Sequence, residues 1–273
     1  MRQDDDPMAT WTQRLTAALL LLALGAGAAP NSPAWRWVHE AAGINQLTLR
    51  AEVYFERGRY ATAEQNFKRI YRGARRLQNK GLALYGMGMC RYHRGRYPDA
   101  AKTLRQAITY YANYIPFHAA LATEYKIAAE YLDGKRYFLG LFSHTKEAAR
   151  AYDHIWQTAP YSRPAAPSLY RRALIELRRR DGRERGKEWL ELFLTRYPDH
   201  ELAPKARLKL ITVLVVEAAR SEGDALNLRR ARHETELLRR LHPESKSLKQ
   251  AERLIADGRE IEGDHLMFLG GFY

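Results

Sequence analysis

The chain has 273 residues, of which 46% are hydrophobic and 28% are charged, and its formal net charge is +14 at pH 7. This composition excludes an intrinsically disordered chain, and a single cysteine excludes a disulfide-rich secreted domain. The basic charge suits nucleic acid, anionic lipid or acidic protein partners, although dispersed arginines are also typical of solvated helix faces.

The first predicted element is an export segment, residues 1–34. Its apolar stretch, residues 15–29, is too short to span a bilayer comfortably and ends in small residues, as export signals do. An Ala-Gly-Ala cleavage site lies at 26–28, and a start at Met8 fits better than the acidic residues before it. The alternative is an uncleaved membrane anchor. In both cases we expect the rest of the chain in the periplasm, and export argues against nucleic acid as a partner.

An internal repeat follows. Residues 57–63 read Arg-Gly-Arg-Tyr-Ala-Thr-Ala, and residues 94–100, 37 positions later, read Arg-Gly-Arg-Tyr-Pro-Asp-Ala. Repeats of about this length with small and aromatic landmarks are typical of stacked helix pairs of the tetratricopeptide type. Such arrays are usually binding scaffolds without catalytic groups of their own.

Five helix pairs are predicted, each with a small residue where its two helices cross and a bulky residue about four positions later. The crossing residues are Ala63, Ala100, Ala148, Gly186 and Ala231. A proline follows each of the last three by 12 positions: Pro160, Pro198 and Pro243. Apolar residues recur at helical spacing, and no stretch alternates as a strand does. The sequence therefore predicts an all-α, tetratricopeptide-like superhelix of about five helix pairs plus a C-terminal helix from about Ser247, in one domain over 35–273.

Three apolar segments need an explanation. The long helix expected over 202–219 is unusually apolar at 211–216, so we expect it to be buried on most sides. A helix expected over 116–132 is followed by an apolar insertion, which either tucks under a neighbouring pair or forms an exposed patch. The closing segment 266–273 either docks a partner, folds back onto the repeats, or marks a truncated gene product. The candidate partner-docking residues are Phe138, Leu141, Phe142, Leu269 and Phe272.

Three segments of the sequence resemble a known protein family. Tyr-Pro-Asp-His-Glu-Leu-Ala at 197–203, Glu-Tyr-x-x-Ala-x-Glu-Tyr at 124–131 and the closing stretch 262–273 are similar to the BamD-type, or ComL-like, outer-membrane assembly factors. The resemblance implies a five-pair periplasmic superhelix that helps to fold β-barrel proteins into the outer membrane. It implies as partners a large barrel-assembly subunit and outer-membrane protein clients, and it is compatible with peripheral contact with the outer membrane. The family's lipidation cysteine is absent from this sequence, so the means of anchoring differs.

Catalytic signals are weak. Cys90 and His93 form a lone C-x-x-H pair without further zinc ligands, and Gly86 and Gly88 lack the third glycine of a dinucleotide loop. We therefore expect no enzyme activity, no metal and no cofactor, and we expect Cys90 to be a buried thiol.

The first helices of stacked pairs line the inner face of such an array. Counted from equivalent positions, this face is predicted to carry a peptide-binding groove of Phe55, Tyr85, Met89, Tyr92 and His93. The alternative is that these aromatic residues pack against the first helix of the third pair. For the whole protein, the alternative to a barrel-assembly scaffold is an envelope adaptor or export accessory that binds polysaccharide, lipopolysaccharide or another envelope complex.

Overall fold

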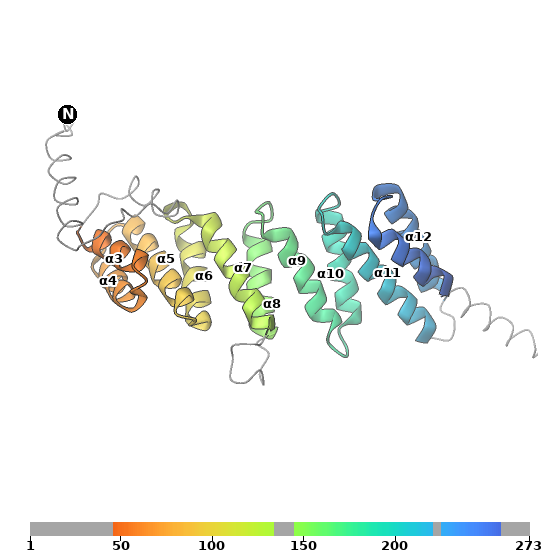
Figure 1. The fold of residues 1–273 in the computed structure, drawn as a ribbon, viewed down its shortest axis with the longest axis horizontal. Coiled ribbons are helices and arrows are strands. Elements are labelled where there is room, and N and C mark those ends of the chain that lie inside the picture. Colours follow the sequence, from red (N-terminus) through yellow and green to blue (C-terminus); the bar gives the residue numbers. More distant parts are fainter. Residues whose placement is uncertain (1–45, 134–144, 221–224, 258–273) are drawn as a thin grey trace, which may run out of the picture. The chain divides into compact units, whose positions relative to one another are not determined.

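The structure of the protein is a computed structural model, and it describes residues 46–133, 145–220 and 225–257 (Figure 1). Every regular element in these ranges is a helix, which confirms the predicted all-α class. By its internal contacts the chain divides into two compact units, unit 1 (1–142) and unit 2 (143–273). The single domain predicted over 35–273 stays a prediction.

Unit 1 is a row of α-helices in which consecutive helices lie side by side (Figure 1). The helix expected over 116–132 is present one position later, as α7. The described elements of unit 1 are α3 (Gln46–Glu56), α4 (Tyr60–Gly73), α5 (Leu77–His93), α6 (Tyr97–Tyr111), the 3-10 turn η1 (Ala112–Tyr114) and α7 (Phe117–Asp133).

Unit 2 continues the same pattern of neighbouring helices. Each of the three predicted prolines lies two residues after the end of a helix, where a residue without an N–H cannot continue it. The C-terminal helix expected from Ser247 is present over 246–257. The other described helices of unit 2 are α8 (Thr145–Thr158), α9 (Ala165–Leu177), α10 (Arg183–Arg196), α11 (Ala203–Arg220) and α12 (Ala225–Leu241).

The predicted crossing residues lie in the two cores. The four alanines have no exposed surface, and a Cβ added to the fifth, Gly186, would lie 2.3 Å from Leu177. The bulky residues that follow them are also buried, among them Phe67 at 1% exposure. The ring of Phe67 from α4 packs against Gly86 of α5, where a Cβ would lie 2.6 Å from the ring. Gly86 and Gly88 are therefore close-packing positions of a helix.

The turn between the two helices of each N-terminal pair depends on glycine. Gly58 and Gly95 have φ values of 71° and 72°, in the left-handed region that other residues rarely adopt. Each glycine lies two residues before the tyrosine that begins the next helix, Tyr60 or Tyr97. The repeated Arg-Gly-Arg-Tyr pattern is thus the sequence of a tight interhelical turn.

The prediction that α11 is buried on most sides is wrong for part of its apolar run. Ile211, Leu214 and Val215 are buried in the core of unit 2, which helix 246–257 also joins. Val216 is 40% exposed, and Val213 is half-buried. A helix turns about 100° per residue, so the six successive residues 211–216, five of them apolar, cannot all face the two helices that cover one side.

Many of the dispersed basic residues join neighbouring helices. Arg105 of α6 pairs with Glu124 of α7 at 3.1 Å, although that carboxylate has no exposed surface. Lys187 of α10 pairs with Glu217 of α11 at 2.7 Å, and its side chain is only 7% exposed. Further pairs, Arg172 with Asp153 and Arg207 with Glu234, join α9 to α8 and α11 to α12. These four cations therefore contribute to the junctions between neighbouring helices.

Candidate protein-binding site

Five aromatic side chains meet at the interhelical turns of unit 1, and we call Phe55, Tyr60, Tyr92, His93 and Tyr97 the aromatic cluster. The centroids of Phe55 and Tyr60 are 5.3 Å apart, and those of the equivalent pair in the next repeat, Tyr92 and Tyr97, are 5.7 Å apart. His93 joins the two repeats, because its ring stacks on Tyr60 at 4.8 Å and meets Phe55 edge-on at 5.3 Å. The 37-residue repeat therefore builds one continuous group of rings.

Some side chains of the aromatic cluster are accessible to solvent and others are buried. Phe55 and Tyr92 are half-buried and His93 is exposed, whereas Tyr97 is 4% exposed and anchors the group in the core. Partial burial lowers the pKa of His93, and the nearby cation of Lys126 on α7 lowers it further. The imidazole is thus held largely neutral at pH 7, with ring nitrogens able both to donate and to accept hydrogen bonds.

The first helices of unit 1 continue this surface toward α7. Met89 of α5 is half-buried, and the hydroxyl of Thr123 on α7 donates to its sulfur at 3.6 Å. Of the five predicted groove residues, Phe55, Met89, Tyr92 and His93 therefore have accessible surface on adjacent helices. That they bind a peptide stays a prediction.

The fifth predicted groove residue, Tyr85, needs a correction. It is 1% exposed, and burial raises the pKa of its hydroxyl to about 12. It is one of the largest fully buried side chains in the described part of the chain. Tyr85 is a core residue of unit 1, since its helix, α5, packs against both α4 and α6.

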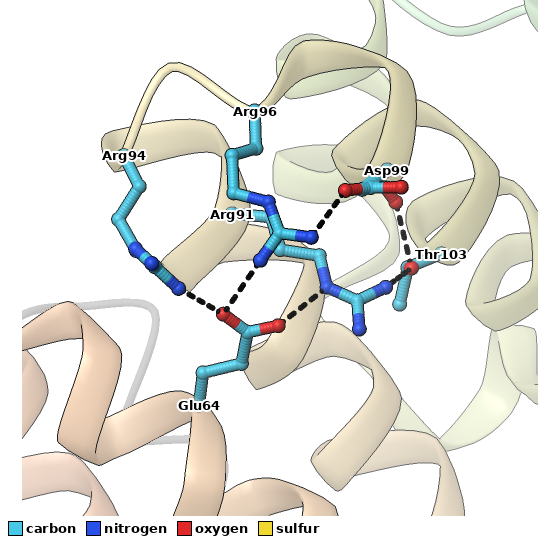
Figure 2. Close-up of polar contacts among 6 residues, drawn as sticks. All are labelled: Glu64, Arg91, Arg94, Arg96, Asp99 and Thr103. Carbon is cyan, nitrogen blue, oxygen red and sulfur yellow. Dashed lines mark hydrogen bonds and ion pairs between the residues drawn. The ribbon is translucent and has the colours of Figure 1, made fainter.

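Sequence reasoning missed a polar cluster at the junction of α4, α5 and α6 (Figure 2). The side chain of Glu64 on α4 is 11% exposed and accepts hydrogen bonds from Arg91 at 2.7 Å and Arg94 at 2.6 Å. A third guanidinium, that of Arg96, lies 3.7 Å from the same carboxylate. Glu64 lies 27 and 30 positions from its two hydrogen-bonding partners. No local sequence signal links residues so far apart.

The same cluster extends into α6. Arg91 donates to the hydroxyl of Thr103 at 2.5 Å, and that hydroxyl donates to the backbone carbonyl of Asp99 at 2.7 Å (Figure 2). The carboxylate of Asp99 pairs with Arg96 at 2.5 Å. The arrangement ties two repeats together, and its groups are mutually satisfied, so we assign it a structural role.

Cys90 was expected to be buried, and its side chain has no exposed surface. Burial, and to a lesser degree the charge of Glu64, raises the pKa of its thiol to about 12 against the opposing effect of Arg94 and Arg91. A thiol of this kind is neither a nucleophile nor a metal ligand at neutral pH. Within residues 46–133, 145–220 and 225–257, no three His, Cys, Asp or Glu side chains are grouped so that they could hold a metal ion.

Two sequence predictions, the partner-docking residues and the export segment, concern parts of the chain that the structure does not describe. The candidate docking residues Phe138, Leu141, Phe142, Leu269 and Phe272 lie outside the described residues, as does the export segment. Among the described helices, none is both long and apolar enough to cross a membrane.

Comparison with known proteins agrees with the repeat pattern. Residues 44–113 match the family described as "Tetratricopeptide repeat". No curated protein matches the chain. Among solved structures, the chain is similar to the nearly identical TPR-like repeats of a kinesin light chain from Podosopora anserina, at 11% identity and a TM-score of 0.37. That match covers 80% of this chain and 94% of the other, and a point variant of the same repeats covers 81% and 95% with the same identity and TM-score. Residues 44–113 are therefore tetratricopeptide-type repeats, a class of helix pair that generally mediates contacts between proteins.

Proposed function

We propose that this protein is a cell-envelope scaffold that binds extended protein segments on the first-helix face of unit 1. The observation that carries the proposal is the aromatic cluster. It joins two repeats through His93 and leaves Phe55, Tyr92 and His93 accessible beside Met89. Half-buried aromatic rings with polar edges can hold an apolar side chain and hydrogen-bond its backbone at low entropic cost.

More specifically, we propose that this scaffold assists the assembly of outer-membrane β-barrel proteins. Two features of the sequence support it: the predicted export segment 1–34 and the resemblance to BamD-type assembly factors. In this role the clients would be extended, unfolded barrel chains, and a barrel-assembly subunit would be the stable partner. No catalytic step is required of the protein, because binding alone keeps an unfolded client from aggregating.

A titration of the full chain with an extended peptide that ends in phenylalanine tests the binding site. We expect Tyr92→Ala to raise the Kd roughly 5- to 150-fold, since an aromatic anchor contributes about 1–3 kcal/mol. The matched control is Tyr161→Ala, because Tyr161 is 98% exposed and lies in unit 2. An unchanged Kd for Tyr92→Ala, or an equal loss in the control, would contradict the proposed site.

Two further measurements test the finer role. Groove binding should be only weakly sensitive to added salt, whereas binding that collapses with salt and survives Tyr92→Ala would favour the polysaccharide- or lipopolysaccharide-binding adaptor. Purification from solubilised envelopes should recover a barrel-assembly subunit with the wild-type chain. Recovery of the protein from the cytosol with its first residues intact would contradict export and the envelope role together.

A further inference from the structure

A second exposed surface of unit 1 lies away from the interhelical turns that hold the aromatic cluster. It is formed by the connection between α4 and α5 and by the neighbouring end of α6 with η1. We call this the basic–tyrosine surface. Its members are Arg72, Arg75, Arg76, Leu77, Lys80, Tyr110 and Tyr114. Among them Tyr110 is 74% exposed, Leu77 is 57% exposed and Tyr114 is 36% exposed.

Close packing makes these residues one surface, although they come from separate elements. Gly81 of α5 is so near to α6 and η1 that an added Cβ would lie 2.7 Å from the Cβ of Tyr111 and 3.2 Å from that of Tyr114. Partial desolvation raises the pKa of Tyr111, and an electrostatic interaction with Tyr71 on α4 contributes to this rise. Tyr111 of α6 and Tyr114 of η1 therefore lie directly beside the first turn of α5, which carries Leu77 and Lys80, and Tyr110 precedes Tyr111 in the chain.

Among the described residues, no carboxylate balances the charge of this surface. The sequence contains no Asp or Glu between Glu64 and Asp99, and both of these carboxylates already pair with arginines of the polar cluster. In the part of the chain that the structure describes, none of the four cations of the surface forms an ion pair with a carboxylate. The first turn of α5 also has no acidic residue and no side-chain cap, so the partial positive charge of its free N–H groups adds to the same field.

The combination of side chains identifies the partner. Arginine and lysine bind phosphate groups, and tyrosine rings are favoured at the boundary between headgroups and acyl chains. An exposed leucine among them gains free energy only from an apolar environment, which a phospholipid bilayer offers beside its phosphates and which a nucleic acid backbone does not. We infer that the basic–tyrosine surface docks unit 1 on a bilayer that contains anionic phospholipids. This contact is additional to the proposed peptide site and independent of it.

Sedimentation of the full chain with phospholipid vesicles tests the inference. The vesicles contain 30% phosphatidylglycerol in phosphatidylcholine, and pure phosphatidylcholine vesicles measure any binding by the apolar N-terminal stretch. The test variant is Arg72→Gln with Arg75→Gln and Arg76→Gln. The matched control carries Arg178→Gln, Arg180→Gln and Arg185→Gln, three exposed arginines of unit 2, so that both variants have the same net charge.

Each basic residue near an anionic bilayer raises partitioning roughly fivefold, so we expect the test variant to lose roughly a hundredfold and the control to retain most of its binding. Binding of the wild type should also weaken as salt is added, and Leu77→Ser should weaken what remains at high salt. Because Arg72, Arg75, Arg76 and Leu77 are exposed, their substitution should leave the melting temperature unchanged. If the triple variant is unstable, the binding of Leu77→Ser alone tests the inference.

Three results would overturn the inference: equal binding of the test variant and the wild type, an equal loss in the unit 2 control, or a Leu77→Ser variant that binds as the wild type does. A loss in the test variant seen with polyglutamate or duplex DNA but not with vesicles would also overturn it, since the surface would then serve an acidic polymer.

Discussion

Glu64→Gln tests how the two N-terminal repeats are held together. The substitution keeps the shape of the side chain but removes the negative charge that Arg91, Arg94 and Arg96 share (Figure 2). It leaves three guanidiniums close together with one amide oxygen between them. We therefore expect the free energy of unfolding to fall.

The structure indicates how large the fall should be. A hydrogen bond to a charged group contributes about 1.5–3 kcal/mol where it is shielded from water, which applies to Arg91 with its side chain 21% exposed. Exposed pairs contribute about 0–1 kcal/mol, which applies to Arg94 at 36% and to Arg96 at 46% exposure. Because glutamine retains an acceptor, the net loss for Glu64→Gln should be about 2 kcal/mol.

Urea denaturation followed by circular dichroism measures this loss, and double-mutant cycles divide it among the partners. The cycle of Glu64→Gln with Arg91→Met should give a coupling energy of about 1–2 kcal/mol. The cycle with Arg96→Met should give about 0–0.5 kcal/mol, because that ion pair is long and exposed. The matched control is Glu191→Gln, which breaks an ion pair with Arg230 of similar length, 2.6 Å, whose side chains are 43% and 47% exposed.

Two results would refute this reasoning. One is a coupling to Arg96 that equals or exceeds the coupling to Arg91. The other is a loss in Glu191→Gln as large as that in Glu64→Gln, which would show that burial does not decide the strength of these pairs.

Three further predictions concern single side chains of α5. Tyr85→Ala should lower the free energy of unfolding by about 3–5 kcal/mol in urea titrations, because it empties a buried ring site; a loss below about 1 kcal/mol would contradict its place in the core. Cys90 should react with a thiol reagent only as fast as the chain opens, since its pKa is raised to about 12, so rapid labelling of the native protein would contradict its burial. His93 has a folded-state pKa below its ordinary value of 6.5, so the unfolded chain binds more protons and the stability of the wild type should fall as the pH drops through 6.5 and below. His93→Gln should reduce this pH dependence in melting curves recorded from pH 7.5 to 5, and an identical pH dependence would contradict the prediction.

Much of the fold follows from local sequence signals. The Arg-Gly-Arg-Tyr pattern predicts a turn at Gly58 and Gly95, because glycine adopts the left-handed conformation at low cost. The crossing residues, the prolines after α8, α10 and α12, and the apolar periodicity predict which segments are helices. These signals act over one or two helical turns, so they can be recognised without knowledge of the tertiary structure.

The sequence by itself therefore determined the helices, their turns and the residues at which paired helices cross. The tertiary structure decided which of the remaining side chains are buried and which meet. Tyr85 and Tyr92 are both aromatic residues of α5, yet only packing between neighbouring helices places the first in the core and the second at the surface. Likewise, Glu64 meets Arg91 only when separate helices are stacked, because a contact across 27 positions depends on the path of the backbone between them and on no local propensity.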